Sequence, residues 1–155
     1  MNLPFPPYEG QEPSIFVWYA KQDKEKALPL LKELHRAGYR LRYYKVPAGG
    51  RPVDVIAVHV TQCAVFMPLL SHCFGKSDDY CYDSVSYARY HKKTIVPVYL
   101  EPEEQVKLPL GLELILHSIE SKRLSDFQTE GDFVLSLENE EALIPCNESG
   151  DCPRP

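Results

Sequence analysis

The stretch Cys63-Ala64-Val65-Phe66-Met67-Pro68-Leu69-Leu70 is apolar at every position. A strand with one solvated face alternates between apolar and polar residues, whereas a strand that is apolar on both faces is covered by helices on both sides. This stretch is also far too short to cross a bilayer. We therefore predict a central strand of a parallel sheet that lies between two layers of helices.

Strand and helix patterns alternate on both sides of this stretch. Strands are predicted at residues 14–19, 39–44, 63–70 and 94–100, and helices from Asp23 to Gly38 and at 54–62, 79–90 and 129–137. Asp23 is expected to cap the first helix and Gly38 to end it. Residues 110–119 are interpreted as a short helix that leads into a last strand. This order predicts an α/β domain, a flavodoxin-like three-layer sandwich with a central parallel sheet of about five strands.

The chain divides into three parts. Residues 1–13 carry four of the fourteen prolines and no apolar periodicity, so an extended leader is expected there. The folded domain is expected at 14–140, and the polar residues 141–155 are expected to form a flexible C-terminal tail. The N-terminus has neither the basic start nor the apolar run of a signal peptide, so a cytoplasmic protein is expected.

Composition narrows the classes of partner and cofactor. The chain has 155 residues, 44% of them hydrophobic, and a net charge of -5, which argues against nucleic acid as the main partner. No apolar stretch is long enough to span a membrane, so no membrane partner is expected. The five cysteines are expected to be reduced thiols, and no metal site is predicted because histidine and cysteine lack the spacing of zinc ligands.

Ligands of parallel α/β sheets bind at the carboxyl ends of the strands. These ends are expected at residues 19–23, 43–50, 70–77 and 100–104. Ser71 and His72 are adjacent at one of them, but no nucleophile elbow surrounds the pair. No catalytic role is therefore predicted for these two residues.

Three segments near these ends share a pattern with one known family. Phe16-Val17-Trp18-Tyr19-Ala20 is followed by Asp23, Arg42-Tyr43-Tyr44 lies in the second predicted strand, and Leu69-Leu70-Ser71 ends the third. These segments resemble the strands of the Toll/interleukin-1 receptor (TIR) domain in its free-standing bacterial form. Trp18 replaces the usual serine, and the second segment keeps only the tyrosine of the family's Trp-Tyr-Asp.

The best match to the family runs from Ser77 to Leu100. The family pattern is Ser-x-x-x-Cys-x-x-Glu, then Tyr-Ala, a basic pair and Ile-x-Pro-Val. This chain matches it without gaps at Ser77, Cys81, Tyr87-Ala88, Lys92-Lys93 and Ile95-Val96-Pro97-Val98, with Ser84 in place of the glutamate. The resemblance implies a TIR fold that is degenerate at the catalytic glutamate.

The resemblance also implies a chemistry that this chain is poorly equipped to perform. Many TIR domains hydrolyse NAD or convert it to cyclic ADP-ribose products with the glutamate at the position of Ser84. Cleavage of the nicotinamide bond builds positive charge on the ribose, and a nearby carboxylate stabilises that charge. Ser84 supplies only a neutral hydroxyl, and Asp83 is a shorter acid that points along a different direction of the helix.

Two further positions weaken the nucleotide site that the resemblance implies. Trp18 is interpreted as a core residue that fills space where a ligand would otherwise approach. Arg42 replaces an aromatic residue that stacks on a nucleobase in the family, and it is interpreted as an exposed strand end.

Two functional hypotheses follow. In the first, the chain is a non-catalytic TIR signalling module that requires no cofactor and acts by assembly with other TIR domains or by holding NAD as a ligand. In the second, it is an NAD hydrolase or cyclase in bacterial defence or host-directed signalling that uses Asp83 or Asp23. The resemblance assigns nucleotide binding to Tyr19, Ala20, Asp23, Tyr43 and Ser71, and the interaction surface to Val46, Pro47, Gly49, Gly50 and Tyr82.

Overall fold

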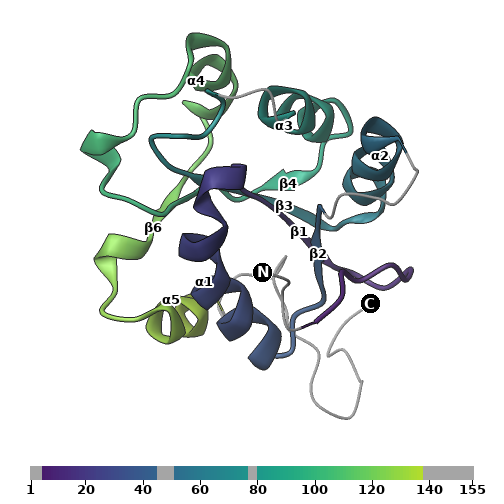
Figure 1. The fold of residues 1–155 in the computed structure, drawn as a ribbon, viewed down its shortest axis with the longest axis horizontal. Helices are drawn as coiled ribbons and strands as arrows, with labels where there is room; N and C mark the ends of the chain where they lie inside the picture. The colour runs from purple at the N-terminus through teal and green to yellow at the C-terminus, as the bar shows by residue number, and fades with distance from the viewer. Residues whose placement is uncertain (1–4, 45–50, 77–79, 138–155) are drawn as a thin grey trace.

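A parallel sheet forms the centre of the molecule (Figure 1). The computed structural model describes residues 5–44, 51–76 and 80–137. The sheet has the order β2-β1-β3-β5-β6, with β4 also paired to β3, and every pairing is parallel. Its strands are β1 (Ile15–Trp18), β2 (Leu41–Tyr43), β3 (Val65–Leu70), β4 (Thr94–Ile95), β5 (Val98–Tyr99) and β6 (Lys122–Arg123). This topology confirms the predicted α/β fold and its parallel sheet.

The apolar stretch from Cys63 to Leu70 contains β3, the middle strand of this sheet. All six residues of β3 are buried, as are all four of β1. Phe16 lies beside Phe66 in the register of these two strands. Strand β3 also pairs on its other edge, so its backbone groups are satisfied on both sides, as the prediction of a central strand required.

The predicted strand 94–100 is broken into two pieces. Thr94 pairs with Val65 and Val98 pairs with Leu69, so β4 and β5 follow the same edge of β3. Pro97 lies between them and has no backbone N–H to donate to a ladder. The two short strands therefore occupy one position in the sheet, which agrees with the expected number of about five.

Helices cover both faces of the sheet, and the side chains of successive strand residues separate into two cores. On one face, α1 (Lys24–Arg36) and α5 (Glu130–Ser136) pack with Val17. On the other face, α2 (Pro52–Gln62), α3 (Cys81–Tyr90) and α4 (Leu110–Leu116) pack with Phe16 and Trp18. In Figure 1, α1 and α5 lie on the lower side of the sheet and the other three helices on its upper side.

Helices α1 and α3 end in the same backbone motif with different residues. Gly38 follows α1 with φ 99°, and its N–H donates to the His35 carbonyl, as the predicted helix end requires. Lys92 follows α3 with φ 56°, and its N–H donates to the Arg89 carbonyl. The left-handed conformation is energetically unfavourable for lysine, which has a Cβ atom, but not for glycine.

The start of α1 differs from the prediction. Asp23 is the residue before the helix, but its side chain accepts no capping hydrogen bond. A short 3-10 turn, Lys21–Asp23, precedes α1, and Asp23 is 1% exposed. Its carboxylate instead accepts a hydrogen bond from the Ser71 hydroxyl. The expectation that Asp23 caps the helix is therefore wrong.

The described part of the leader packs along the outer edge of β2. The Tyr8 backbone N–H donates to the Leu41 carbonyl at 2.8 Å. Phe5 is buried and stacks on the His35 ring with 4.0 Å between the ring centroids. Residues 138–155, which include the expected tail at 141–155, lie outside the described residues.

Candidate functional site at the carboxyl edge of the sheet

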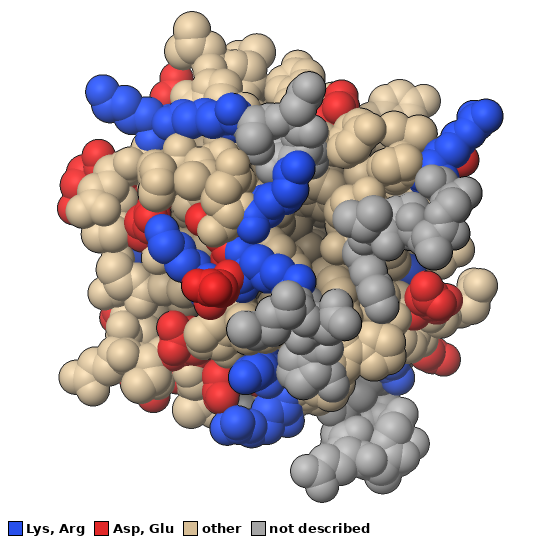
Figure 2. Space-filling view, in the orientation of Figure 1, with Lys and Arg blue, Asp and Glu red and all other residues tan. Residues whose placement is uncertain are grey.

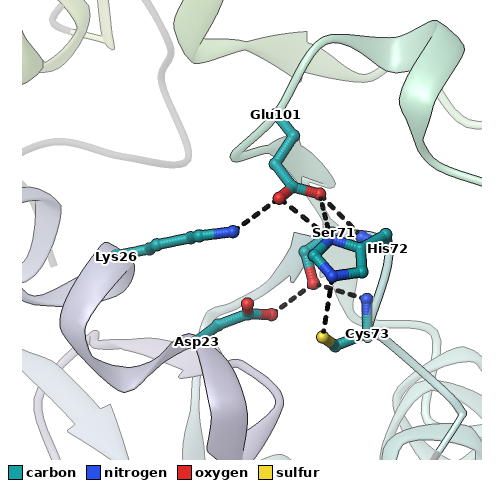
Figure 3. Close-up of polar contacts among 6 residues, drawn as sticks. All are labelled: Asp23, Lys26, Ser71, His72, Cys73 and Glu101. Carbon is teal, nitrogen blue, oxygen red and sulfur yellow. Dashed lines mark hydrogen bonds and ion pairs between the residues drawn. The ribbon is translucent and has the colours of Figure 1, made fainter.

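A polar cluster lies where β1, β3 and β5 end. Asp23 and Lys26 follow β1, Glu101 follows β5, and Ser71, His72 and Cys73 follow β3 (Figure 3). Because parallel strands end at the same edge, segments far apart in the sequence meet here. Among the predicted nucleotide-binding residues, Asp23 and Ser71 are thus brought into direct contact.

Glu101 is the centre of this cluster. Its carboxylate accepts hydrogen bonds from Lys26 Nζ at 2.5 Å, from the His72 backbone N–H at 2.8 Å and from His72 Nδ1 at 2.9 Å. Partial burial raises the pKa of the Glu101 carboxyl, but the bonds from Lys26 and His72 outweigh this and lower the pKa to about 2. Glu101 is therefore an anion at neutral pH, and it fixes the orientation of the His72 ring.

The Ser84 hydroxyl is enclosed by the fold. Ser84 is 0% exposed, and its Oγ donates to the Cys81 carbonyl of the same helix at 3.1 Å. Cys81 and Ala88 are buried on the same face of α3, while Asp83 is exposed. The two candidate catalytic positions of the sequence therefore lie on different sides of α3.

Trp18 connects the end of β1 to the start of α3. Its indole N–H donates to Cys81 Sγ at 3.2 Å, and its ring stacks on Tyr44 with 5.6 Å between centroids. Trp18 itself is 3% exposed. Its interpretation as a core residue agrees with this packing, and the space between β1 and α3 is occupied by the protein's own side chains.

The sheet separates the predicted nucleotide-binding tyrosines from Ser84. Tyr43 is buried in the core under α1, and its hydroxyl donates to the Phe5 carbonyl. Tyr19 packs against the same core, and burial, followed by the proximity of Tyr43, raises its pKa to about 12. Ser84 lies in α3 on the opposite face, and Ala20 is buried.

Arg42 is not an exposed strand end, so that expectation is wrong. It is 0% exposed because the leader and α2 cover this edge of the sheet. Its guanidinium donates to Ser14 Oγ at 2.7 Å and to the Gly10 carbonyl at 2.5 Å, and its Nη1 lies 3.3 Å from His59 Nδ1. These acceptors are neutral, so Arg42 holds the leader against β2 rather than pairing with an acid.

The predicted interaction surface is described only at Tyr82, which is 51% exposed on α3. Val46, Pro47, Gly49 and Gly50 lie outside the described residues. The neighbouring tyrosines 80 and 90 are 37% and 77% exposed. Helix α3 thus presents several aromatic side chains to solvent.

Within residues 5–44, 51–76 and 80–137, no group of three or more His, Cys, Asp or Glu side chains is placed to hold a metal ion. An open groove of about 400 Å³ lies between α1 and α5, lined in part by Glu25, Glu33 and Glu130. It contains none of the predicted site residues.

The contact of His72 with Cys73 and Glu101 was missed by the sequence prediction. The available signal was a histidine and a cysteine directly after one buried strand, with an acid directly after another. Neighbouring strands of a parallel sheet bring such residues together, but the order of the strands in the sheet is not visible in the sequence.

In the part of the chain that the structure describes, no helix is long and apolar enough to span a membrane.

Comparisons with known proteins agree with this fold. The TIR domain family model matches residues 15–136. The TIR domain of a Toll-related receptor from Hydra magnipapillata is 17% identical, with a TM-score of 0.62 over 79% of this chain and 89% of that one. A flavodoxin-like domain from Synechococcus is 12% identical, with a TM-score of 0.52 over 84% of this chain and 95% of that one.

No curated protein sequence matched the chain. The structural likenesses are under 25% identical and bear on the fold alone. The family model, in contrast, covers more than half of the chain, including every described strand and helix. The chain therefore belongs to the TIR domain family.

Proposed function

We propose that this chain is a non-catalytic TIR signalling module that acts in a bacterial cytoplasm by assembly with other TIR domains, or by holding NAD without cleaving it. The observation that carries the proposal is the enclosed serine at position 84. Its hydroxyl is satisfied within its own helix and is not exposed. An NAD-cleaving site needs a carboxylate at the reacting ribose, and removal of such a group typically lowers the rate by about 10²- to 10⁴-fold.

The packing of Trp18 supports the same conclusion. Its bond to Cys81 and its stacking on Tyr44 fill the region between β1 and α3. A ligand that entered there would have to displace a buried indole and break its hydrogen bond.

The surface of α3 and α4 supports assembly. Tyr82 is 51% exposed, and Leu110 and Leu114 of α4 are 82% and 68% exposed. Gly111 of α4 lies against the Tyr82 ring of α3, so both helices carry exposed apolar side chains near the place where they meet. Aromatic residues are enriched in protein interfaces. Charges of both signs are interspersed over the face in Figure 2, which suits a protein partner better than a nucleic acid.

The experiment for assembly is sedimentation of the purified chain over a range of concentrations. We expect concentration-dependent association that Tyr82→Arg weakens at least ten-fold. Leu135→Arg is the matched control, because Leu135 is 61% exposed on α5, on the opposite face of the sheet. Equal effects of both substitutions would contradict an interface on α3.

The second candidate function is NAD hydrolysis or cyclisation, and the exposed carboxylate of Asp83 in the first turn of α3 favours it. Purified protein is incubated with NAD, and nicotinamide release is measured. We expect no turnover above the blank. Turnover that Asp83→Asn abolishes would instead establish the chain as an NAD-cleaving enzyme.

A further inference from the structure

The side chains of Cys73, His72 and Glu101 form a chain of contacts from a thiol to an imidazole to a carboxylate (Figure 3). Cys73 Sγ lies 3.4 Å from His72 Nε2, and His72 Nδ1 lies 2.9 Å from Glu101 Oε1. Cys73 is half-buried and the His72 side chain is 58% exposed, so solutes reach both groups. The proposed TIR assembly does not use this cluster.

The Glu101 contact determines which ring nitrogen of His72 is the donor. A carboxylate only accepts hydrogen bonds, so His72 donates from Nδ1, and in the neutral imidazole Nε2 is then the acceptor that faces the thiol. A thiol, a base and a third group that orients the base are the parts of an activated cysteine nucleophile. Lys26 holds Glu101 from the other side, which keeps the carboxylate in place.

Acyl transfer is not the chemistry that this geometry favours. Such a reaction needs backbone N–H groups that are free to stabilise an oxyanion beside the nucleophile. The Cys73 N–H already donates to Ser71 Oγ, and the Phe74 N–H donates to the Ser71 carbonyl. Exchange with a disulfide needs no oxyanion site, only a thiolate and access for the reagent.

We propose that Cys73 is a reactive thiol, activated by His72 and Glu101, that forms a reversible mixed disulfide with low-molecular-weight disulfides. The thiol proton passes to His72 Nε2, and the Cys73 sulfur attacks one sulfur of the reagent. A new sulfur–sulfur bond forms as the reagent's own bond breaks, and the leaving thiolate takes up the proton. Cys73 is thereby oxidised to the disulfide level, and half of the reagent is reduced to a thiol.

Among the described cysteines, only Cys73 is accessible, so no other described thiol is exposed to resolve the mixed disulfide. Cys63 and Cys81 are each 2% exposed and lie in the core on the α2–α4 side. Cys146 and Cys152 lie outside the described residues. The test therefore uses the full chain with Cys146→Ser and Cys152→Ser, so that Cys73 is the accessible thiol among the described cysteines.

The parent with these two serines is incubated with glutathione disulfide at pH 7, and adducts are followed by intact mass and peptide mapping. An ordinary thiol is only a few per cent thiolate at pH 7. Transfer of the thiol proton to a positioned base supplies more of the nucleophilic thiolate, and the lower basicity of such a thiolate takes back part of that gain. We expect one adduct on Cys73, removable by dithiothreitol, and a rate that His72→Ala lowers about five-fold.

Two readouts separate activation from a structural role. Added imidazole should restore part of the rate in His72→Ala, because the removed ring is exposed and leaves an accessible gap. Glu101→Gln should slow the reaction more at pH 6.5 than at pH 8.5, where about half of an ordinary thiol is already ionised. His91→Ala is the matched control and should react at the parent rate, since His91 is exposed at the far end of α3.

The proposal is overturned by any of three results: no adduct on Cys73, equal rates in the parent and His72→Ala, or no rescue by imidazole. None of these outcomes depends on whether the chain assembles or cleaves NAD. A failure of the assembly experiment would accordingly leave this inference standing.

Discussion

His59 packs against the buried guanidinium of Arg42, and this contact makes folding stability depend on pH. His59 is 5% exposed, and its Nδ1 lies 3.3 Å from Arg42 Nη1. A guanidinium only donates hydrogen bonds, so Nδ1 accepts and the imidazole is neutral. Protonation of His59 would place two cations in contact inside the protein.

The size of the effect follows from the pKa of His59. Burial, followed by the charge of Arg42, lowers this pKa from 6.5 to about 4. The unfolded chain has the ordinary value and binds the proton first as the pH falls. The contribution of His59 is therefore complete above pH 6.5 and is lost as the pH falls to about 4. At about 1.4 kcal/mol per pKa unit, the loss is about 3 kcal/mol.

The assay is urea unfolding between pH 7.5 and 4.5, followed by the fluorescence of the single tryptophan, Trp18. His59→Asn keeps an acceptor near the Nδ1 position but does not titrate. We expect the wild type to lose about 2 to 3 kcal/mol more stability over this range than the variant. His91→Asn leaves the Arg42 contact in place and should retain the wild-type pH dependence. If His59→Asn lost as much stability as the wild type, the reasoning would be refuted.

Three further substitutions test the packing of the domain by urea unfolding. Lys92→Gly removes about 1 kcal/mol of left-handed strain but adds conformational freedom to the unfolded chain, so we expect a net gain in stability of about 0.5 kcal/mol. A loss of stability would contradict the shared helix end at Gly38 and Lys92. Ser84→Glu forces a carboxylate into an enclosed position, and we expect a loss of at least about 3 kcal/mol; wild-type stability would show that the site is open. Trp18→Phe removes the bond to Cys81 and leaves a gap, which should lower stability by about 2 kcal/mol; no change would mean that the indole contributes little to the packing between β1 and α3.

Local patterns were sufficient for the architecture. An uninterrupted apolar run predicted the central strand, and residues 65–70 of that run are buried throughout. Apolar residues at helical spacing, followed by Gly38, predicted where the first helix ends. Such features follow from side-chain burial and backbone preferences within a few residues, so the sequence carries them directly. The motif match between Ser77 and Leu100 then predicted the family as well as the fold.

The partners of polar side chains were not visible in the sequence. Asp23 resembled a helix cap but bonds Ser71, and Arg42 resembled a strand end but is buried under the leader. His72 and Glu101 are separated by 29 positions and meet because β3 and β5 are neighbours. A hydrogen bond depends on which loops share an edge of the sheet, and that order is a property of the packed chain. The sequence by itself determined the elements and their alternation, while the tertiary structure alone decided which charges and thiols came into contact.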